Sequence, residues 1–196
     1  MTGPHWIIVP VVLPLMAGAA LLLLERSRAA LAARLSLAAT AAHLLVSIGL
    51  AAQAADGGVR AYLLGNWSAP FGIALALDRL SALLLVLTGV IALATVAYAV
   101  AGAAKTRVDR LGPHFHALFH FQLMGLSGAF LTADLFNLFV FFEVLLIASY
   151  GLLLHGGGAA RLKASIHYVA FNLAGSSLFL IAVSLLYALT GTLNMA

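Results

Sequence analysis

The 196-residue sequence contains no cysteine and very few charged residues, which make up only 8% of the chain. The absence of cysteine excludes disulfides, thiolate metal sites, covalently attached haem and cysteine-bound iron–sulfur clusters. An average soluble domain has about 25% charged residues. With 64% hydrophobic residues and a mean hydropathy of +1.11, this composition instead indicates an integral membrane protein.

The apolar residues fall into six runs of about 20 residues, the length at which an α-helix crosses the hydrocarbon layer of a bilayer. These runs are too long to be the short alternating strands of a membrane β-barrel. The turn signals AADGG and NWSAP, within 54–76, predict a short extramembrane hairpin or loop. We therefore predict an all-α membrane protein with about six transmembrane helices. Helices 1–3 fall in 1–112 and helices 4–6 in 113–196, and the expected spans are 5–24, 30–53, 77–102, 113–132, 134–155 and 164–189.

The basic residues are distributed unevenly between the expected loops. Two of the ten lysines and arginines, Arg60 and Arg79, lie on the side of the even loops. The positive-inside rule then places the odd loops in the cytoplasm and both termini outside. The other eight basic residues lie in or beside the odd loops: Arg26, Arg28, Arg34, Lys105, Arg107, Arg110, Arg161 and Lys163.

A single carboxylate, Glu143, lies near the middle of the fifth expected span. It follows Asp134 by nine residues, which corresponds to ~14 Å of depth at 1.5 Å per residue. A charged side chain at mid-bilayer costs at least ~2.5–3.5 kcal/mol on insertion scales. A carboxylate kept only for structure has little reason to lie at this depth, whereas one that must exchange a proton or a cation inside the membrane does. Glu143 is therefore the principal candidate for a functional residue.

The second and fourth spans carry histidines that are further candidates. His43 lies inside the second span, where a neutral, hydrogen-bonded packing role competes with a role in transport. His116 and His120 are four residues apart and share one helix face. This spacing could bind a metal, but no carboxylate lies nearby in the sequence, so we expect no metal site here. An interfacial cluster or a proton-entry role are the remaining interpretations.

The sixth span carries Asn172 and Ser176 on one face. Small and polar residues at such positions permit close helix contacts and interhelical hydrogen bonds. They are also compatible with a hydrated path beside Glu143. Both interpretations stay open from the sequence alone.

The segment DLFNLFVFFEVLLIASYGLLL, followed after a short basic loop by KASIHYVAFNLAGSSLFLIAVSLLYALTGTLNMA, resembles the D-type subunits of the Mrp/Pha-type multi-subunit cation/proton antiporters. These subunits are similar to the proton-translocating, antiporter-like subunits of respiratory complex I. The hairpin region with PFGIALALD also resembles that family. The resemblance covers most of the chain and is strongest over 119–196.

The resemblance implies a fold of about fourteen helices built from two inverted repeats, of which this chain would be the N-terminal portion. It also implies that a carboxylate of the fifth helix pairs with a lysine of the seventh. Glu143 occupies the carboxylate position, and its lysine partner is expected beyond Ala196. Asp134, Lys163, His167 and Asn172 are weaker candidates for the ion path.

The resemblance therefore implies a subunit that exchanges Na⁺ or K⁺ for H⁺ in the bacterial cytoplasmic membrane. We expect it to have other antiporter subunits as partners, no cofactor and no enzymatic activity. One alternative is a proton-translocating subunit of a complex I-like oxidoreductase or a membrane-bound hydrogenase. The other is a purely structural subunit, in which neutralising Glu143 would leave transport intact.

Overall fold

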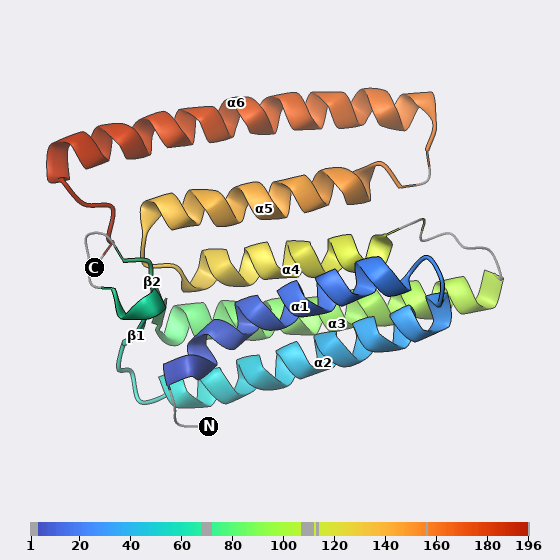
Figure 1. The fold of residues 1–196 in the computed structure, drawn as a ribbon, viewed down its shortest axis with the longest axis horizontal. Coiled ribbons are helices and arrows are strands. Elements are labelled where there is room, and N and C mark those ends of the chain that lie inside the picture. The colour runs from blue at the N-terminus through green and yellow to red at the C-terminus, as the bar shows by residue number, and fades with distance from the viewer. Residues whose placement is uncertain (1–3, 68–71, 107–111, 113, 156, 196) are drawn as a thin grey trace.

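A computed structural model describes residues 4–67, 72–106, 112, 114–155 and 157–195. Six α-helices dominate it, and each connects to the next by a short loop or hairpin (Figure 1). A 3₁₀ turn, η1 (Pro4–Ile8), precedes the first helix and a second, η2 (Leu64–Asn66), lies in the hairpin. The helices are α1 (Val9–Leu24), α2 (Ala29–Ala54), α3 (Arg79–Thr106), α4 (Phe115–Leu131), α5 (Leu135–Leu153) and α6 (Ala159–Thr190).

Five of these helices are long and apolar enough to cross a membrane by length and composition, α1 when it is counted together with the preceding 3₁₀ turn as His5–Leu24. The remaining helix, α4, has 17 residues and lies between α1 and α5. At 1.5 Å per residue it is ~26 Å long, close to the shortest helix that spans a bilayer. The all-α membrane architecture predicted from the sequence is confirmed, and the six helices lie close to the six expected spans.

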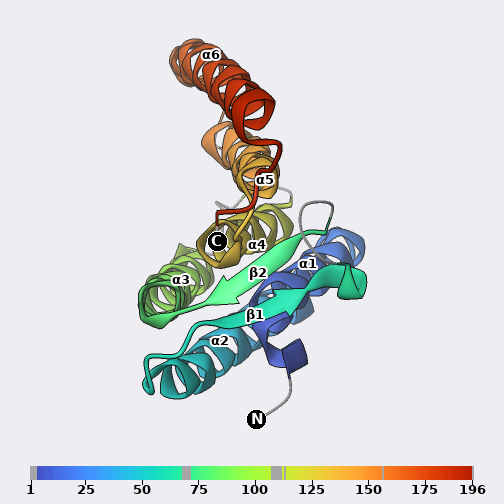
Figure 2. The same cartoon turned by 90° about the vertical axis from the view of Figure 1, so that its left-hand side faces the viewer.

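The helices form a four-helix group with two further helices on one side of it. Helices α1 to α4 pack around a common centre, and α5 and α6 stack outward from α4 in turn (Figures 1 and 2). The inner faces of α1 and α2 bury a stripe at three- and four-residue spacing, as helices facing a core do. Helix α6 has only Ser165 and Val183 fully buried, so most of its apolar surface is exposed.

A β-hairpin closes one end of the group, within the region where the turn signals predict a hairpin or loop. Strands β1 (Arg60–Leu63) and β2 (Ala74–Leu77) are antiparallel, with Arg60 opposite Leu77 and Leu63 opposite Ala74. Leu75 and Leu77 point into an apolar cluster with Leu50, Leu85 and Leu131, all at most 2% exposed. The hairpin therefore seals the core at this end (Figure 2).

The turn between α4 and α5 is pinned from two directions. The backbone N–H of Ala133 donates to Ala74 O of the hairpin at 2.9 Å, and its carbonyl accepts from the N–H of Met195 at 2.8 Å. The N–H of Leu135 donates to Leu193 O at 2.9 Å. These bonds fix the start of α5 between the hairpin and the segment after α6.

Two carboxylates at the hairpin end are held by local hydrogen bonds. The N–H and hydroxyl of Ser81 donate to Asp78 at 2.7 Å, which caps the start of α3 and holds the pKa of Asp78 below its usual value. Asp56 accepts from Arg60 at 2.7 Å, and this bond lowers the pKa of Asp56. Both groups therefore stay ionised at neutral pH and mark a water-facing edge.

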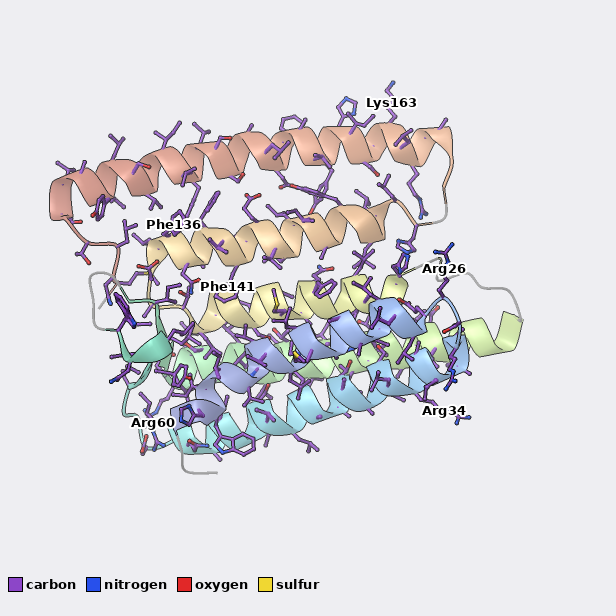
Figure 3. The ribbon with its side chains drawn as sticks, viewed as in Figure 1. Arg26, Arg34, Arg60, Phe136, Phe141 and Lys163 are labelled. Carbon is purple, nitrogen blue, oxygen red and sulfur yellow. The ribbon has the colours of Figure 1, made fainter. Side chains whose placement is uncertain are left out.

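The two ends of the bundle differ in charge in the way that the sequence predicts. Arg26, Arg34 and Lys163 lie at the end with the α1–α2 and α5–α6 connections, whereas Arg60 lies at the hairpin end (Figure 3). The N- and C-terminal segments are both at the hairpin end (Figure 1). Arg107 and Arg110 fall outside the described residues. Which end faces the cytoplasm, and the division at 112, stay predictions.

Chemical labelling tests this orientation. In a cysteine-free form of the protein in whole cells, we expect single cysteines at Ser27 and Gly157 to be shielded from a membrane-impermeant maleimide. A cysteine at Thr192 should react, because it lies at the opposite end of the bundle. Everted vesicles should give the reverse pattern. Reaction of Gly157 and Thr192 cysteines from the same side would refute the six-span topology.

Candidate functional site: a polar seam between two membrane helices

The candidate site lies where α6 packs on α5. The inward stripe of α6 consists of residues at alternating spacings of four and three, whereas their neighbours on the other faces are exposed. We name the contact between this stripe and α5 the α5–α6 seam. Its α6 residues are Ser165, Val169, Asn172, Ser176, Phe179 and Val183.

Aromatic contacts fix the register of the seam. The rings of Phe139 and Phe179 are stacked with their centroids 6.3 Å apart, and those of Tyr150 and Tyr168 meet edge-on at 5.7 Å. Because the two helices are antiparallel, these pairs place Glu143 at the level of Gly175 (Figure 1). The inward-facing Asn172 and Ser176 are the neighbours of Gly175 along that face of α6. Glu143 therefore lies on the seam, near the middle of α5.

Three polar atoms on this seam are buried without a partner. Among the described residues, Glu143 Oε1, the Tyr150 hydroxyl and Asn172 Nδ2 make no hydrogen bond. Each buried, unpaired polar atom costs about 1–3 kcal/mol. Glu143 and Tyr150 are seven residues apart, so they are two turns apart on the same face of α5. The seam therefore holds hydrogen-bonding capacity that these two helices do not satisfy between themselves.

Aromatic rings cover Glu143 on the side of the seam that leads to the hairpin. Phe142 meets Phe179 edge-on at 6.2 Å, next to the stacked Phe139, so three rings lie between Glu143 and the hairpin end of the seam. At the other end Tyr168 packs edge-on against Tyr150, and the hydroxyl oxygen of Tyr168 lies 3.5 Å from Ser149 Oγ. The seam is thus apolar toward the hairpin and polar toward the basic end of the bundle.

The structure brings together only some of the residues singled out from the sequence. Glu143 and Asn172 share the seam. Asp134 instead caps α5, accepting the backbone N–H of Asn137 at 2.7 Å. Lys163 and His167 are exposed on other faces of α6, with His167 Nδ1 2.8 Å from Lys163 O, and Lys163 points away from α5 (Figure 3). Within this chain, these three residues make no described contact with Glu143.

Two tyrosines of the seam were not singled out from the sequence. Tyr150 and Tyr168 resemble ordinary interfacial aromatic residues when each is considered alone. The seven-residue spacing from Glu143 to Tyr150 is the available signal, because it puts both on one face. Tyr168 could be found only once the register between α5 and α6 is known.

His43 and His120 lie away from the seam, at the centre of the four-helix group. His43 Nε2 is 2.9 Å from Ser127 Oγ, and His120 Nε2 is 3.2 Å from Ser36 Oγ, with all four side chains 0% exposed. Among the described residues, no group of three or more His, Cys, Asp and Glu side chains could hold a metal ion. His120 pairs with Ser36, and the backbone N–H of His116 donates to Glu25 at the end of α1 at 2.7 Å, so the sequence prediction that this histidine pair binds no metal stays a prediction.

Close packing of α4 and α5 positions the seam. A Cβ added at Gly125 would lie 2.8 Å from Leu145 N and 2.9 Å from Phe141 O, which are backbone atoms that cannot rotate away. At Gly128 the ring of Phe141 occupies the space that a side chain would need. These two glycines let α5 lie directly on α4 with Phe141 turned inward, which leaves Glu143 to face α6.

The matching family model, described as "NADH:quinone oxidoreductase/Mrp antiporter, TM", covers residues 132–196. The D-type subunit of a probable K(+)/H(+) antiporter from Rhizobium meliloti (strain 1021) is 52% identical over 98% of this chain and 36% of its own length. The D-type subunit of an Na(+)/H(+) antiporter from Bacillus subtilis (strain 168) is 41% identical over 98% of this chain and 38% of its own. The chain thus spans little more than a third of these relatives.

Solved structures give the same picture. A chain of the Mrp complex from Dietzia sp. DQ12-45-1b superposes with a TM-score of 0.91 at 32% identity, covering 99% of this chain and 36% of that one. A chain of respiratory complex I from Thermus thermophilus superposes with a TM-score of 0.75 at 28% identity, covering 96% and 38%. The arrangement of the six helices is therefore common to antiporter and respiratory complexes.

The glycine contact can be tested by substitution. We expect Gly125→Ala to destabilise the protein by about 1–3 kcal/mol, because the added methyl group forces α4 and α5 apart. The measurement is the fraction of detergent-solubilised protein that stays monodisperse after heating. Gly102→Ala is the matched control, since a Cβ there meets no atom within 4 Å. Equal heat stability of the two variants would show that α5 does not depend on this close approach.

Proposed function

Because the chain belongs to the family of antiporter-like membrane subunits that includes the D-type subunits of Mrp antiporters, we propose that it forms the first third of a subunit that exchanges Na⁺ or K⁺ for H⁺. The exchange would take place across the bacterial cytoplasmic membrane, within a complex of several subunits. Curated relatives named for K⁺ and for Na⁺ are both similar to this chain, so the proposal covers either cation.

One observation carries the proposal. Glu143 is a carboxylate at mid-membrane depth, and its Oε1 is buried with no hydrogen-bond partner among the described residues. A carboxylate kept for structure would be paired, because burying it unpaired is costly. A carboxylate that must bind and release a proton needs an oxygen without a permanent hydrogen bond and a positively charged partner that binds only in one state. The geometry of the seam suits the second role.

The chemistry of the exchange follows from the surroundings of Glu143. In an apolar layer without a nearby cation, the protonated and neutral carboxyl group is the less costly form. A positive charge that approaches Oε1 stabilises the carboxylate, so the proton leaves as the ion pair forms. The Tyr150 hydroxyl and Asn172 Nδ2 are donors on the same seam that can stabilise the ionised state. Proton binding and cation approach at Glu143 are thereby mutually exclusive, which is the requirement for exchange.

The weaker path candidates take subsidiary places in this proposal. Asn172 lies on the seam and is a direct neighbour of the ion path. Asp134 marks the hairpin end of α5, whereas Lys163 and His167 mark the basic end of α6. As groups near the membrane edges, these three would collect or release ions without contacting Glu143.

The surface of α6 accounts for the proposed partners. Large apolar side chains such as Phe171, Leu178 and Leu189 are 77%, 68% and 84% exposed on its outer faces. Lipid or further membrane helices must cover them. Because the relatives are longer and one belongs to a complex, we expect the covering helices to come from the remainder of a subunit and from other subunits. A positive partner for Glu143 is expected from that remainder.

A second function has support from one observation, the similarity to a chain of respiratory complex I. In that case the same carboxylate would move protons, but a redox reaction in partner subunits would drive the movement. The identity of the partner subunits, found by purifying the complex, distinguishes the two functions. Redox proteins among them would favour the second, and small membrane subunits alone would favour the first.

Neutralising Glu143 tests the proposed function. In the complete complex, Glu143→Gln should lower cation/proton exchange by about 100-fold or more, the scale on which a positioned proton carrier acts. Glutamine keeps the size and hydrogen-bonding capacity of the side chain but cannot titrate. Exchange is measured as collapse of a pH gradient on adding Na⁺ or K⁺ to everted vesicles, with the amount of assembled complex determined in parallel.

Two further variants sharpen this experiment. Glu143→Asp should retain partial activity, because it titrates but is shorter by one methylene group. Asp56→Asn removes an exposed carboxylate at the hairpin end and should leave exchange unchanged. Wild-type exchange in Glu143→Gln at normal assembly would mean that the carboxylate is structural.

A further inference from the structure

A second group of buried polar side chains lies away from the α5–α6 seam, at the centre of the four-helix group. Helix α2 packs on α1 and α3, and α4 packs on α1, so α2 and α4 face each other across the centre. We name the polar side chains between them the His–Ser column. Its members are all 0% exposed: Ser36, Thr40, His43 and Ser47 from α2, and His120 and Ser127 from α4.

The column is ordered by two matching hydrogen bonds. Ser36 pairs with His120 and His43 with Ser127, each pair 84 residues apart in sequence. The helices therefore run parallel and in register, with the histidine on α4 in one pair and on α2 in the other. The two pairs are two helical turns apart, and Thr40 lies between them on α2.

The hydroxyl group of Ser127 determines which ring nitrogen of a neutral His43 carries the proton. Ser127 donates its hydroxyl hydrogen to Leu123 O at 2.8 Å, so its oxygen can only accept from His43. The proton of a neutral His43 is thus on Nε2, which leaves Nδ1 with a lone pair. Nδ1 is buried and makes no hydrogen bond within the described part of the chain.

The column presents acceptors to its interior. The hydroxyl hydrogens of Thr40 and Ser47 are also donated to carbonyl oxygens of α2, both at 2.8 Å. Their oxygens, like Nδ1 of His43, have only lone pairs to offer. Burial in an apolar bundle opposes a charged imidazole ring, and the surrounding lone pairs are what would offset part of that cost for a proton added at Nδ1.

The positions of the ionisable groups around His43 indicate the end from which a proton can reach the column. Toward the basic end of the bundle, His120 is followed one turn away by His116, which is 5% exposed. Glu25, at the end of α1, accepts the backbone N–H of His116 at 2.7 Å. Otherwise α1 (Val9–Leu24) has no ionisable residue, and on α3 Arg79 and Tyr98 are exposed. The side chain of Lys105, at the far end of α3, is outside the described part.

The opposite end of the column meets mostly apolar packing. Beyond Ser47, the buried side chains of α2 are Leu50 and Ala54, which join the apolar cluster under the hairpin. Gln53, near the end of α2, is half-buried, and its Oε1 accepts from Arg60 Nη1 at 3.3 Å. The other histidines beside the column lie toward the Glu25 end, so that end is where we expect a proton to enter.

We propose that His43 is a second intramembrane proton-binding site, loaded from the Glu25 end through His116 and His120. Protonation at Nδ1 converts the neutral imidazole to the imidazolium, while Nε2 keeps its hydrogen bond to Ser127. The site is separate from Glu143, because α4 and the inward face of α5 lie between them. It gives the N-terminal helices a role in proton binding in addition to packing.

Proton counting on the purified complex tests this proposal without requiring transport. We expect His43→Gln to bind about one proton fewer than wild type between pH 9 and pH 3 in a potentiometric difference titration, a window wide enough for a histidine whose charged form is disfavoured by burial. Glutamine is the matched substitution, because its Nε2 can still donate to Ser127. His5→Gln, which removes an exposed histidine outside the column, is the reference variant. Ser127→Ala removes the hydrogen bond but keeps the ring, so its proton count should match wild type.

The outcomes separate the proposal from a packing role. If His43 serves only as a hydrogen-bond donor to Ser127, the His43→Gln titration will superimpose on that of wild type, and the proposal is wrong. Because no transport is measured, failure of the exchange experiment at Glu143 leaves this result intact. In an active complex, His43→Gln should also shift the pH profile of exchange, whereas Ser127→Ala should leave its midpoint in place.

Discussion

The structure depends on one constraint: a polar group inside an apolar layer must find a partner within the protein. The backbone meets this requirement through helices, which pair their own N–H and C=O groups. Side chains meet it by turning into the contacts between helices. The buried polar side chains at mid-depth accordingly gather in two places, the α5–α6 seam and the His–Ser column, whereas exposed hydroxyl groups such as those of Thr95 and Ser177 donate to carbonyl oxygens of their own helices.

The packing of α4 on α5 divides these two places. Gly125 and Gly128 bring the helices into close contact and receive Phe141 between them. With Phe141 inward, Glu143 is turned toward α6, and Ser127 is turned toward α2. One helix pair thus separates Glu143, which lies on the α6 side, from the His–Ser column, which lies on the α2 side.

Much of the fold could be predicted from the sequence, because the length of apolar runs and the positions of turn residues are local properties. The mid-depth position of Glu143 also follows from counting along one helix. The contacts between helices do not. That Asn172 lies on the seam with Glu143, whereas Lys163 and His167 are exposed, depends on the rotation of α6 about its axis. The stripe that defines this rotation mixes serine, valine and phenylalanine without strong contrast.

The pairing of His43 with Ser127 could not be predicted from the sequence for a similar reason. The two residues are 84 positions apart, and either one could have faced lipid, α1 or α3. Only the parallel arrangement of α2 and α4 makes the Ser36–His120 and His43–Ser127 pairs coincide. The same arrangement places a hydroxyl group, that of Ser36, opposite His120.

The most direct test of the proposed exchange is the protonation state of Glu143 itself. Infrared difference spectra of the purified complex, recorded before and after addition of Na⁺ or K⁺, would detect the C=O stretch of a protonated carboxyl group. The proposed mechanism predicts that this band is present without the cation, is lost when the cation is added, and is missing throughout in Glu143→Gln. A carboxyl band that does not respond to either cation, or a cation-induced loss that persists in Glu143→Gln, would contradict it.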